Sequence, residues 1–445
     1  MRYYIRTYGC TLNQADSEIM NNLLLENGFE LADSEENADV IVVNTCTVKA
    51  PTEEKILNYI KCLHNDGKQI IASGCLATVS PEKILKYAPN AGIISTTNID
   101  KIIEAASEIK NKSLIFNKQQ RIDKLFYINK KFSFQNPLIA KIPINEGCLG
   151  FCTFCETKFA RGALNSFSEE LILNAIDMSV KKGAVEIQLT SQDTGAYGVD
   201  KKTNIIKLMK KIKALDSFKS INQSQNKNKN QECMIRIGMM NPEHIFDIVD
   251  EFLELIDDKP FYKFVHLPVQ SGSNKVLKDM HREYTNDNFI QLVKKIRNRI
   301  PSITLETDII VGFPTESDED FNETLKLVKE IKADIVNMSK FWKREHAPAA
   351  KLKQLPNEVI AERSIELARV VRKIQKEINE TFIGKVIEAT ITEEDKYSFA
   401  ARSESYKKII IKKTDDNAEN LKLGMNLNIK IKSATANVLY GKASK

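Results

Sequence analysis

The sequence of 445 residues predicts an α/β protein built from three parts. Residues 1–107 alternate between strand and helix patterns, which indicates a small doubly wound α/β domain. Residues 137–372 repeat a strand and a helix about six times, which is typical of a partial, TIM-like (β/α)6 barrel. Residues 373–445 start within a helix and continue with five short alternating strands, which favours a small β-barrel.

Composition and charge set limits on what the chain can be. Its 28% charged and 42% apolar residues are typical of a globular protein, and no run of about 20 apolar residues or signal-peptide pattern is present. We therefore expect a cytoplasmic protein without membrane contact. The net charge of +6 permits nucleic-acid binding without requiring it. In a large reduced chain, the eight cysteines favour metal binding over disulfides.

The first domain is predicted to hold parallel strands separated by helices. The continuous apolar run at Asp39–Asn44 is typical of a strand buried on both faces. Residues 108–136, rich in Lys, Asn and Gln, are expected to form a linker with a short hairpin. The expected strands are Arg2–Tyr8, Asp39–Asn44, Lys68–Ala72 and Ile93–Ile94, and the expected long helices are Leu12–Asn27 and Thr52–Leu63.

A cysteine follows each of the first three expected strands, namely Cys10, Cys46 and Cys75. Parallel strands direct their carboxyl ends to one edge, where open α/β sheets place ligands, so the three thiols should converge. Gly9 and Gly74 allow the backbone to approach a bulky group closely. The pattern predicts an iron–sulfur cluster on three thiolates, with small buried apolar side chains as the alternative.

A second set of three cysteines forms the motif C-x3-C-x2-C at Cys148, Cys152 and Cys155. Three thiolates leave a zinc site one ligand short, but they can hold three irons of a [4Fe–4S] cluster and leave the fourth iron open. The alternatives are a zinc site with a remote fourth ligand, or unreactive buried thiols. The spacing resembles that of the radical S-adenosylmethionine (SAM) enzymes. In that superfamily the open iron chelates SAM, and one electron cleaves it to a 5′-deoxyadenosyl radical.

The central region is expected to place its polar and glycine-rich loops at the carboxyl ends of its strands, where barrel enzymes work. These loops offer hydrogen-bonding groups that suit SAM, although a plain strand-end cap is the alternative for each. Phe154, next to Cys155, is assigned to the same cofactor site. The expected strands are Leu138–Ile144, Val185–Thr190, Met234–Gly238, Phe264–Leu267, Thr307–Val311 and Ile335–Met338. The other candidate SAM contacts are Ser191, Gln192, Arg236, Gln270 and Ser273.

The remaining segments are predicted to be structural or to bind nucleic acid. The low-complexity residues 217–232 should form a surface insertion without a catalytic role, and Cys62 and Cys233 should be structural. Residues 381–445 carry 12 Lys and Arg against 8 Asp and Glu, so the small barrel could bind a phosphate backbone, with simple packing on the core as the alternative. The expected elements are a packing helix at Pro356–Glu380 and strands at Gly384–Ile391, Tyr397–Arg402, Tyr406–Lys412, Met425–Ile431 and Ala436–Leu439.

Taken together, residues 1–442 resemble the methylthiotransferases of the radical SAM superfamily, in the family's order of three-cysteine domain, radical SAM core and TRAM domain. The resemblance is closest to the archaeal and eukaryotic branch that modifies N6-threonylcarbamoyladenosine beside the tRNA anticodon. Two departures lie at the mouth of the site: Glu156 and Phe159 replace the usual Lys and His, and residues 343–348 replace an Arg-Pro-Gly-Thr segment. The motifs that carry the resemblance are Tyr8-Gly9-Cys10, Asn44-Thr45-Cys46, Gly147–Cys155, Ala160-Arg161-Gly162, Leu189–Thr194 and Arg236–Pro242.

The resemblance implies a transferase that converts N6-threonylcarbamoyladenosine at position 37 of tRNA into its 2-methylthio derivative. It implies two [4Fe–4S] clusters, one on Cys148, Cys152 and Cys155 and one on Cys10, Cys46 and Cys75. The first would reduce SAM to a radical that takes hydrogen from C2 of the adenine, and the second would hold the sulfur that is inserted. A second SAM would supply the methyl group. The implied partners are tRNA and an electron donor such as flavodoxin or ferredoxin, and no catalytic residue is implied beyond the cluster ligands.

Two other functions remain open from the sequence. A ribosomal-protein methylthiotransferase would share the architecture, but the basic C-terminal barrel and the Gly238–Pro242 segment count against it. A non-catalytic iron–sulfur protein that binds RNA is the second alternative. The glycine-rich loops and the two open-iron cysteine sets count against that one, and a failure to form 5′-deoxyadenosine under strong reductant would favour it.

Overall fold

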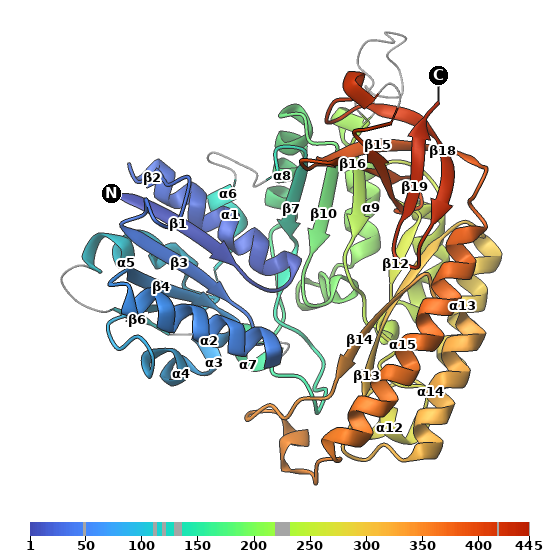
Figure 1. The fold of residues 1–445 in the computed structure, drawn as a ribbon, viewed down its shortest axis with the longest axis horizontal. Coiled ribbons are helices and arrows are strands. Elements are labelled where there is room, and N and C mark those ends of the chain that lie inside the picture. The colour runs from blue at the N-terminus through green and yellow to red at the C-terminus, as the bar shows by residue number, and fades with distance from the viewer. Residues whose placement is uncertain are drawn as a thin grey trace.

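The three predicted parts are present in the computed structural model of the chain (Figure 1). The structure describes residues 1–47, 50–109, 114–117, 122–128, 136–218, 232–415 and 418–444. Most of the expected insertion at 217–232 therefore lies outside the described residues. Within the described part, no helix combines the length and the apolar character needed to cross a membrane.

The N-terminal domain is a parallel six-stranded sheet in the order β2-β1-β3-β4-β5-β6. The central strand β3 (Val40–Thr45) is buried along its whole length, with Val40 and Val42 on one face and Ile41 and Val43 on the other. Helices cover both faces, so the doubly wound prediction is confirmed. The other elements are β1 (Arg2–Thr7), β2 (Glu30–Leu31), β4 (Gln69–Gly74), β5 (Gly92–Ile94), α1 (Thr11–Glu26), α2 (Ala50–Asn65), α3 (Cys75–Val79), α4 (Pro81–Leu85) and α5 (Ile102–Glu108).

The segment after this domain differs from the sequence prediction in its described part. Ile115–Phe116 forms β6, which pairs in parallel with β5 and so extends the sheet, where a hairpin was expected. A strand of two residues is too short to produce an alternating pattern in the sequence. A short helix, α6 (Leu125–Ile128), follows, and linker residues 110–113, 118–121 and 129–135 lie outside the described residues.

The core is formed by two three-stranded parallel sheets, β7-β10-β11 and β12-β13-β14, linked by a parallel bridge between Ile235 and Phe261. Alternate strand residues such as Ile187 and Leu189 join the large apolar core under the helices, so the polar residues between them face the inside of the partial barrel. The strands are β7 (Ile139–Pro143), β10 (Glu186–Thr190), β11 (Met234–Ile237), β12 (Phe264–His266), β13 (Thr304–Val311) and β14 (Ile335–Lys340). The main helices are α8 (Glu169–Lys181), α9 (Ile205–Lys213), α11 (Val249–Ile256), α12 (Asn274–Asp279), α13 (Asn286–Arg299) and α14 (Asp318–Ile331).

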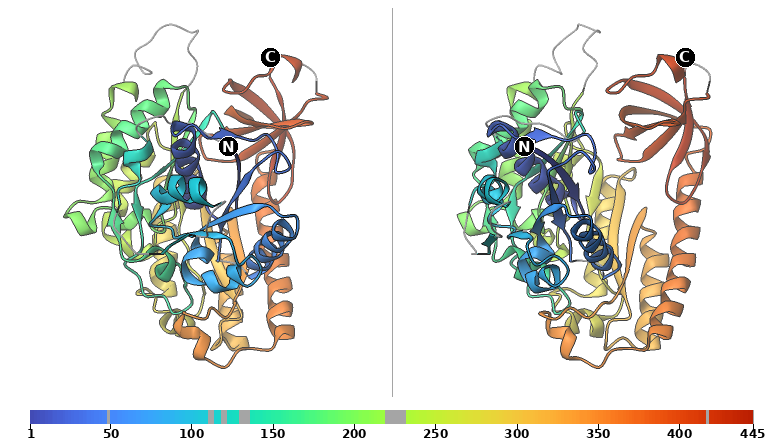
Figure 2. Two further views of the ribbon diagram at one scale, coloured as in Figure 1. Left: turned by 90° about the vertical axis from the view of Figure 1, so that its left-hand side faces the viewer. Right: turned by 60° about the vertical axis from the view of Figure 1, so that its left-hand side comes forward.

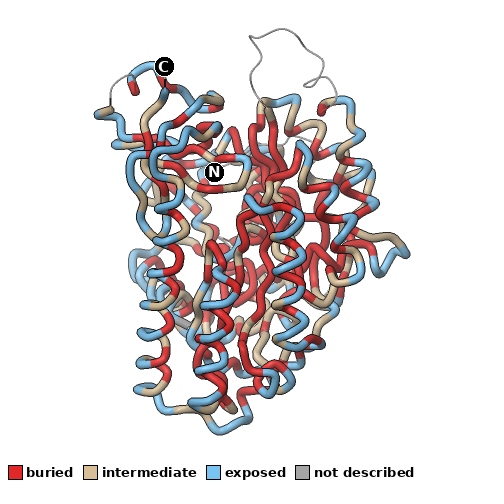
Figure 3. The backbone as a smooth tube through the Cα atoms, turned by 90° about the vertical axis from the view of Figure 1, so that its right-hand side faces the viewer, coloured by how far each residue is buried: buried red, intermediate tan, exposed pale blue. Residues whose placement is uncertain are grey.

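The tube in Figure 3 shows how the core is enclosed. Buried segments gather in the strands at the centre, whereas the outer helices alternate between buried and exposed residues along their length. Helix α15 (Asn357–Glu380) follows this pattern, with Leu367 and Val371 in the large core. The amphipathic helix expected at Pro356–Glu380 is thus confirmed. The expected domain boundary at residue 372 falls inside this continuous helix, so the division of the chain stays a prediction.

The C-terminal residues close into a five-stranded barrel in the order β15-β16-β17-β19-β18, at one end of α15 (Figure 2). The last strand differs from the prediction, because residues 435–438 form a turn in which the Thr435 hydroxyl accepts bonds from the backbone N–H groups of Asn437 and Val438. The strand therefore starts at Leu439. The strands are β15 (Val386–Glu394), β16 (Ser398–Ser403), β17 (Lys408–Lys412), β18 (Asn426–Ala434) and β19 (Leu439–Ala443).

This small barrel is fixed to the amino ends of the core strands. The Tyr406 hydroxyl donates to Glu186, the first residue of β10, at 3.0 Å, and Lys407 pairs with Asp334, just before β14, at 2.7 Å. The cysteine loop follows the carboxyl end of β7 and lies at the other end of the core. The barrel therefore contacts the chain on the side away from the cysteines.

Candidate active site

The three N-terminal cysteines lie together at the carboxyl edge of the sheet. Cys10 directly precedes α1, Cys46 follows β3, and Cys75 starts α3 after β4. Cys46 and Cys75 are buried, whereas Cys10 is exposed. Burial raises the pKa of the Cys75 thiol to about 12; the Arg161 guanidinium opposes this rise, and the nearby Cys10 and Cys46 thiols add to it. We call Cys10, Cys46 and Cys75 the N-terminal triad.

The second set, which we call the core triad, lies on the loop between β8 (Asn145–Glu146) and α7 (Thr157–Arg161). The Gly150 N–H donates to Cys148 Sγ at 3.3 Å, and Arg282 Nη1 donates to Cys152 Sγ at 3.4 Å. Burial raises the pKa of Cys148 to about 12, and Asp193 adds to the rise. Burial also raises the pKa of Cys152, against the opposing charge of Arg282.

Both triads open on one cavity of about 610 Å³ between the N-terminal domain and the core. Its wall includes Cys10 and Cys46 from the N-terminal triad and Cys155 from the core triad. The remaining wall comes from N-terminal residues near Cys10 and Cys46, from the residues on either side of Cys155, and from the inside of β12, β13 and β14 and the segments that follow them. These residues are Gly9, Thr47, Thr52, Phe154, Glu156, Thr157, His266, Gln270, Asp308, Ile309, Ile310, Asn337, Ser339, Lys340, Phe341, Trp342 and Arg344.

Three thiolates in each triad match the ligand set of an iron–sulfur cluster that leaves one iron open. Among the described residues, no three His, Cys, Asp or Glu side chains are arranged to hold one metal ion. A [4Fe–4S] cluster bonds each thiolate to a different iron, so its ligands need not share one centre. Glycines also keep space next to the sulfurs: a Cβ at Gly150 would lie 3.5 Å from Cys148 Sγ, and one at Gly9 would lie 3.1 Å from Cys46 Sγ. The residues present therefore fit a cluster at each triad.

The candidate SAM contacts divide into two groups. Phe154 and Gln270 line the cavity, and Gln270 has a positive φ of 71°. The other four are bonded within the chain. The Ser273 hydroxyl donates to Asp320, Ser191 Oγ accepts the Asp193 N–H, Gln192 Oε1 accepts the Gly147 N–H, and Arg236 stacks on Phe264 and Tyr406. As SAM contacts, all six remain predictions.

Sequence reasoning missed a polar group on the inner face of the core. His266 Nε2 lies 3.0 Å from Asp308 Oδ1, and Asn337 Nδ2 donates to the same oxygen at 2.8 Å. Burial lowers the pKa of His266, but the Asp308 and Glu306 carboxylates outweigh burial and raise it overall. The available signal was the polar residue at every second position in the first part of β13, Thr304, Glu306 and Asp308, which marks the inward face of a barrel strand.

The two departures noted in the sequence meet in the structure. The Phe159 ring lies 5.8 Å from the His346 ring, so a residue of the first departure packs on one of the second. Glu156 accepts a hydrogen bond from the Thr47 hydroxyl at 2.7 Å, across the two domains. The changes at positions 156, 159 and 346 thus form part of one contact surface between the N-terminal domain and the core.

Comparison with known proteins covers both cysteine domains. Residues 2–95 match the family described as "Uncharacterized protein family UPF0004", and residues 142–328 match the radical SAM superfamily. A protein of Archaeoglobus fulgidus called "Probable threonylcarbamoyladenosine tRNA methylthiotransferase" is 39% identical over 99% of this chain and 98% of its own length. The Homo sapiens "Threonylcarbamoyladenosine tRNA methylthiotransferase" is 34% identical over 93% of this chain and 69% of its own length.

The chain belongs to the threonylcarbamoyladenosine tRNA methylthiotransferase family. Among solved structures, the radical SAM methyltransferase TsrM of Kitasatospora setae, with cobalamin and a [4Fe–4S] cluster bound, matches with a TM-score of 0.56. The match is 12% identical and covers 86% of this chain and 75% of that one, so it supports the fold alone. The identities to the Archaeoglobus fulgidus and Homo sapiens proteins confirm the predicted resemblance to this methylthiotransferase family.

Gly74 illustrates how tightly this family member is built around its N-terminal triad. The residue has a φ of +90°, and a Cβ there would lie 2.3 Å from Asn44 Oδ1 and 2.5 Å from the Thr45 carbonyl. We expect Gly74→Ala to lower the free energy of unfolding by roughly 3 kcal/mol, measured by urea unfolding followed by circular dichroism. Gly67→Ala is the matched control, because Gly67 also has a positive φ but no atom lies within 4 Å of its Cβ position. Its expected cost is only about 1–2 kcal/mol, and equal losses for both variants would contradict the steric argument.

Proposed function

We propose that this chain converts N6-threonylcarbamoyladenosine at position 37 of tRNA into its 2-methylthio derivative, with two [4Fe–4S] clusters and SAM as cofactors. The observation that carries the proposal is the shared cavity: Cys10 and Cys46 of one triad and Cys155 of the other line the same 610 Å³ space. A single substrate held there would face both triads without leaving the protein.

The cofactors supply chemistry that side chains lack. Once bound, they provide hydrogen abstraction from an unactivated aromatic C–H bond, sulfur transfer and methylation. The core triad, Cys148, Cys152 and Cys155, would hold one cluster, and the N-terminal triad would hold the other. The protein's task is to bind and orient the modified base between them and to keep water out. The apolar side chains of Phe154, Ile309 and Phe341 in the cavity wall serve that exclusion.

The cavity wall also offers a place for the negative charge of the substrate. The threonylcarbamoyl group ends in a carboxylate, and the cations on the wall are Lys340 and Arg344. Arg344 donates through Nη1 to Glu53 at 2.7 Å, while its buried Nη2 has no hydrogen-bond partner among the described residues. A guanidinium with a free donor beside a cavity is suited to binding a carboxylate.

The same function assigns partners and a location. Its substrate is tRNA, and the basic C-terminal barrel, with its excess of four positive charges over residues 381–445, supports contact with a phosphate backbone. Electrons for SAM cleavage would come from a small reductant such as flavodoxin or ferredoxin. The substrate and the cysteine-rich site both suit a reducing cytoplasm.

Nucleoside mass spectrometry of tRNA tests this function directly. Cells that contain this gene should hold the 2-methylthio form of threonylcarbamoyladenosine, and cells that lack it should hold only the unthiolated precursor. Returning the gene should restore the product. If the tRNA nucleosides are identical with and without the gene, tRNA is not the substrate, and the modified target is to be sought among ribosomal proteins.

A further inference from the structure

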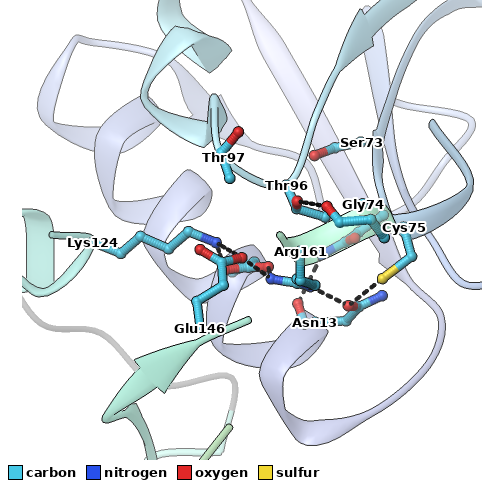
Figure 4. A network of polar contacts seen from close by, with 12 residues as sticks. Asn13, Ser73, Gly74, Cys75, Thr96, Thr97, Lys124, Glu146 and Arg161 are labelled. Carbon is cyan, nitrogen blue, oxygen red and sulfur yellow. Dashed lines mark hydrogen bonds and ion pairs between the residues drawn. The ribbon is translucent and has the colours of Figure 1, made fainter. Parts of the chain in front are cut away.

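Arg161 lies on α7, six residues after Cys155, yet it points into the N-terminal domain (Figure 4). Its side chain is completely buried. Nη1 pairs with Asp16 of α1 at 2.7 Å and with Glu146 of β8 at 2.6 Å. The Thr96 hydroxyl, from the N-terminal domain, donates to the Ala160 carbonyl at 2.5 Å and so fixes the backbone next to it. This arginine is therefore held rigidly between the two domains.

The second guanidinium nitrogen of Arg161 is hydrogen-bonded to Asn13, which lies beside the N-terminal triad. Nη2 donates to Asn13 Oδ1 at 2.6 Å. The same Asn13 oxygen lies 3.8 Å from Cys75 Sγ. Asn13 Nδ2 donates to the carbonyls of Tyr8 at 2.9 Å and Thr45 at 2.8 Å, which directly precede Gly9-Cys10 and Cys46. Asn13 thus contacts all three cysteine loops, and Arg161 holds Asn13 in place.

Lys124 pairs with the same two carboxylates as Arg161 but is not hydrogen-bonded to Asn13 in the described part of the chain. Lys124 is also completely buried, and its ammonium pairs with Asp16 at 2.9 Å and with Glu146 at 2.8 Å. Among the described residues, its ammonium donates hydrogen bonds to these two carboxylates and none to Asn13. The two cations balance the two carboxylates, and of these two cations Arg161 is the one that donates to Asn13 in the described part of the chain.

We propose that Arg161 is a positioning residue for the cluster on Cys10, Cys46 and Cys75, and that its charge raises the reduction potential of that cluster. The inference rests on the proposed two-cluster function. A cluster-bound thiolate has no proton to donate, so the bond between Cys75 and Asn13 belongs to the free thiol, whereas the guanidinium stays charged beside the sulfur. A fixed positive charge stabilises the more negative, reduced form of a cluster.

The test uses the full-length chain with Cys148, Cys152 and Cys155 all changed to Ala, so that only the N-terminal triad can be loaded with iron and sulfide. The midpoint potential is measured by a redox titration followed by electron paramagnetic resonance. Adding Arg161→Gln should shift the midpoint to a more negative potential. Arg161→Lys keeps the positive charge, so its midpoint potential should stay close to that of the parent. An unchanged midpoint in Arg161→Gln at full iron content would overturn the proposal.

Lys124→Gln is the matched control, because it removes one charge from the same buried network and leaves the contact with Asn13. Its shift should be clearly smaller than that of Arg161→Gln, and an equal shift would show that Arg161 acts only through the overall charge balance. Asn13→Ser tests the contact even if Arg161→Gln does not fold. It should reduce the iron bound by the N-terminal triad and alter the resonance spectrum, and full loading with an unchanged spectrum would reject a positioning role. A parent triad that binds no iron would instead overturn the two-cluster function itself.

Discussion

Cys148→Ala is expected to abolish the formation of 5′-deoxyadenosine from SAM. Two thiolates remain on the core loop, and a [4Fe–4S] cluster held there by three cysteines loses an anchor and with it the route by which an electron reaches SAM. The reconstituted variant should bind about four iron atoms per chain, where the parent binds about eight. Chromatographic detection of 5′-deoxyadenosine under dithionite measures the first effect, and an iron assay measures the second.

Cys62→Ala is the control for this variant, because Cys62 is an exposed cysteine outside both triads. It should retain SAM cleavage and the full iron content. Cleavage of SAM by Cys148→Ala at the parent's rate would show that the C-x3-C-x2-C loop does not hold the cluster that reduces SAM.

Cys46→Ala should have the opposite pattern: SAM cleavage continues, but no sulfur enters the tRNA. Cys46 is a buried member of the N-terminal triad and lines the shared cavity. In the proposed function, its loss would remove a ligand of the sulfur-supplying cluster and leave the core triad intact. Both products are measured in one reaction, 5′-deoxyadenosine by chromatography and the 2-methylthio nucleoside by mass spectrometry. Methylthiolation that survives in Cys46→Ala would refute the assignment of two clusters.

The elements that the sequence revealed are those whose environment leaves a local pattern. Strand β3 is buried on both faces and therefore appears as an unbroken apolar run, and the six core strands alternate with helices at a regular spacing. Strand β6 consists of only two residues, and the start of β19 depends on the turn at Thr435. Neither leaves a periodic signal long enough to recognise.

The candidate site was predictable from the sequence only where residue type and spacing mark it. Six cysteines in two spaced sets are visible in a linear sequence, because their chemistry depends on residue type and on position after a strand. The contact between Arg161 and Asn13 joins residues 148 positions apart, and only folding brings them together. Lys124 occurs in a segment rich in Lys and Asn, a composition that predicts a solvated linker. Its burial depends on Asp16 and Glu146, which come from two other parts of the chain.

The segment that connects the N-terminal domain to the core, residues 108–136, limits which domains can be exchanged between related proteins. It carries β6, which covers the edge of β5, and Lys124, which balances carboxylates on both sides of the domain boundary. A fragment cut at residue 107 would expose an unpaired strand edge, a recognised cause of aggregation, and would leave Asp16 without either cation. A chimera must therefore include the N-terminal domain together with the segment through residue 128. Its core must carry residues equivalent to Glu146 and Arg161. The unit that can be inherited or engineered as a block is defined by these buried charges and is larger than the domain visible in the sequence.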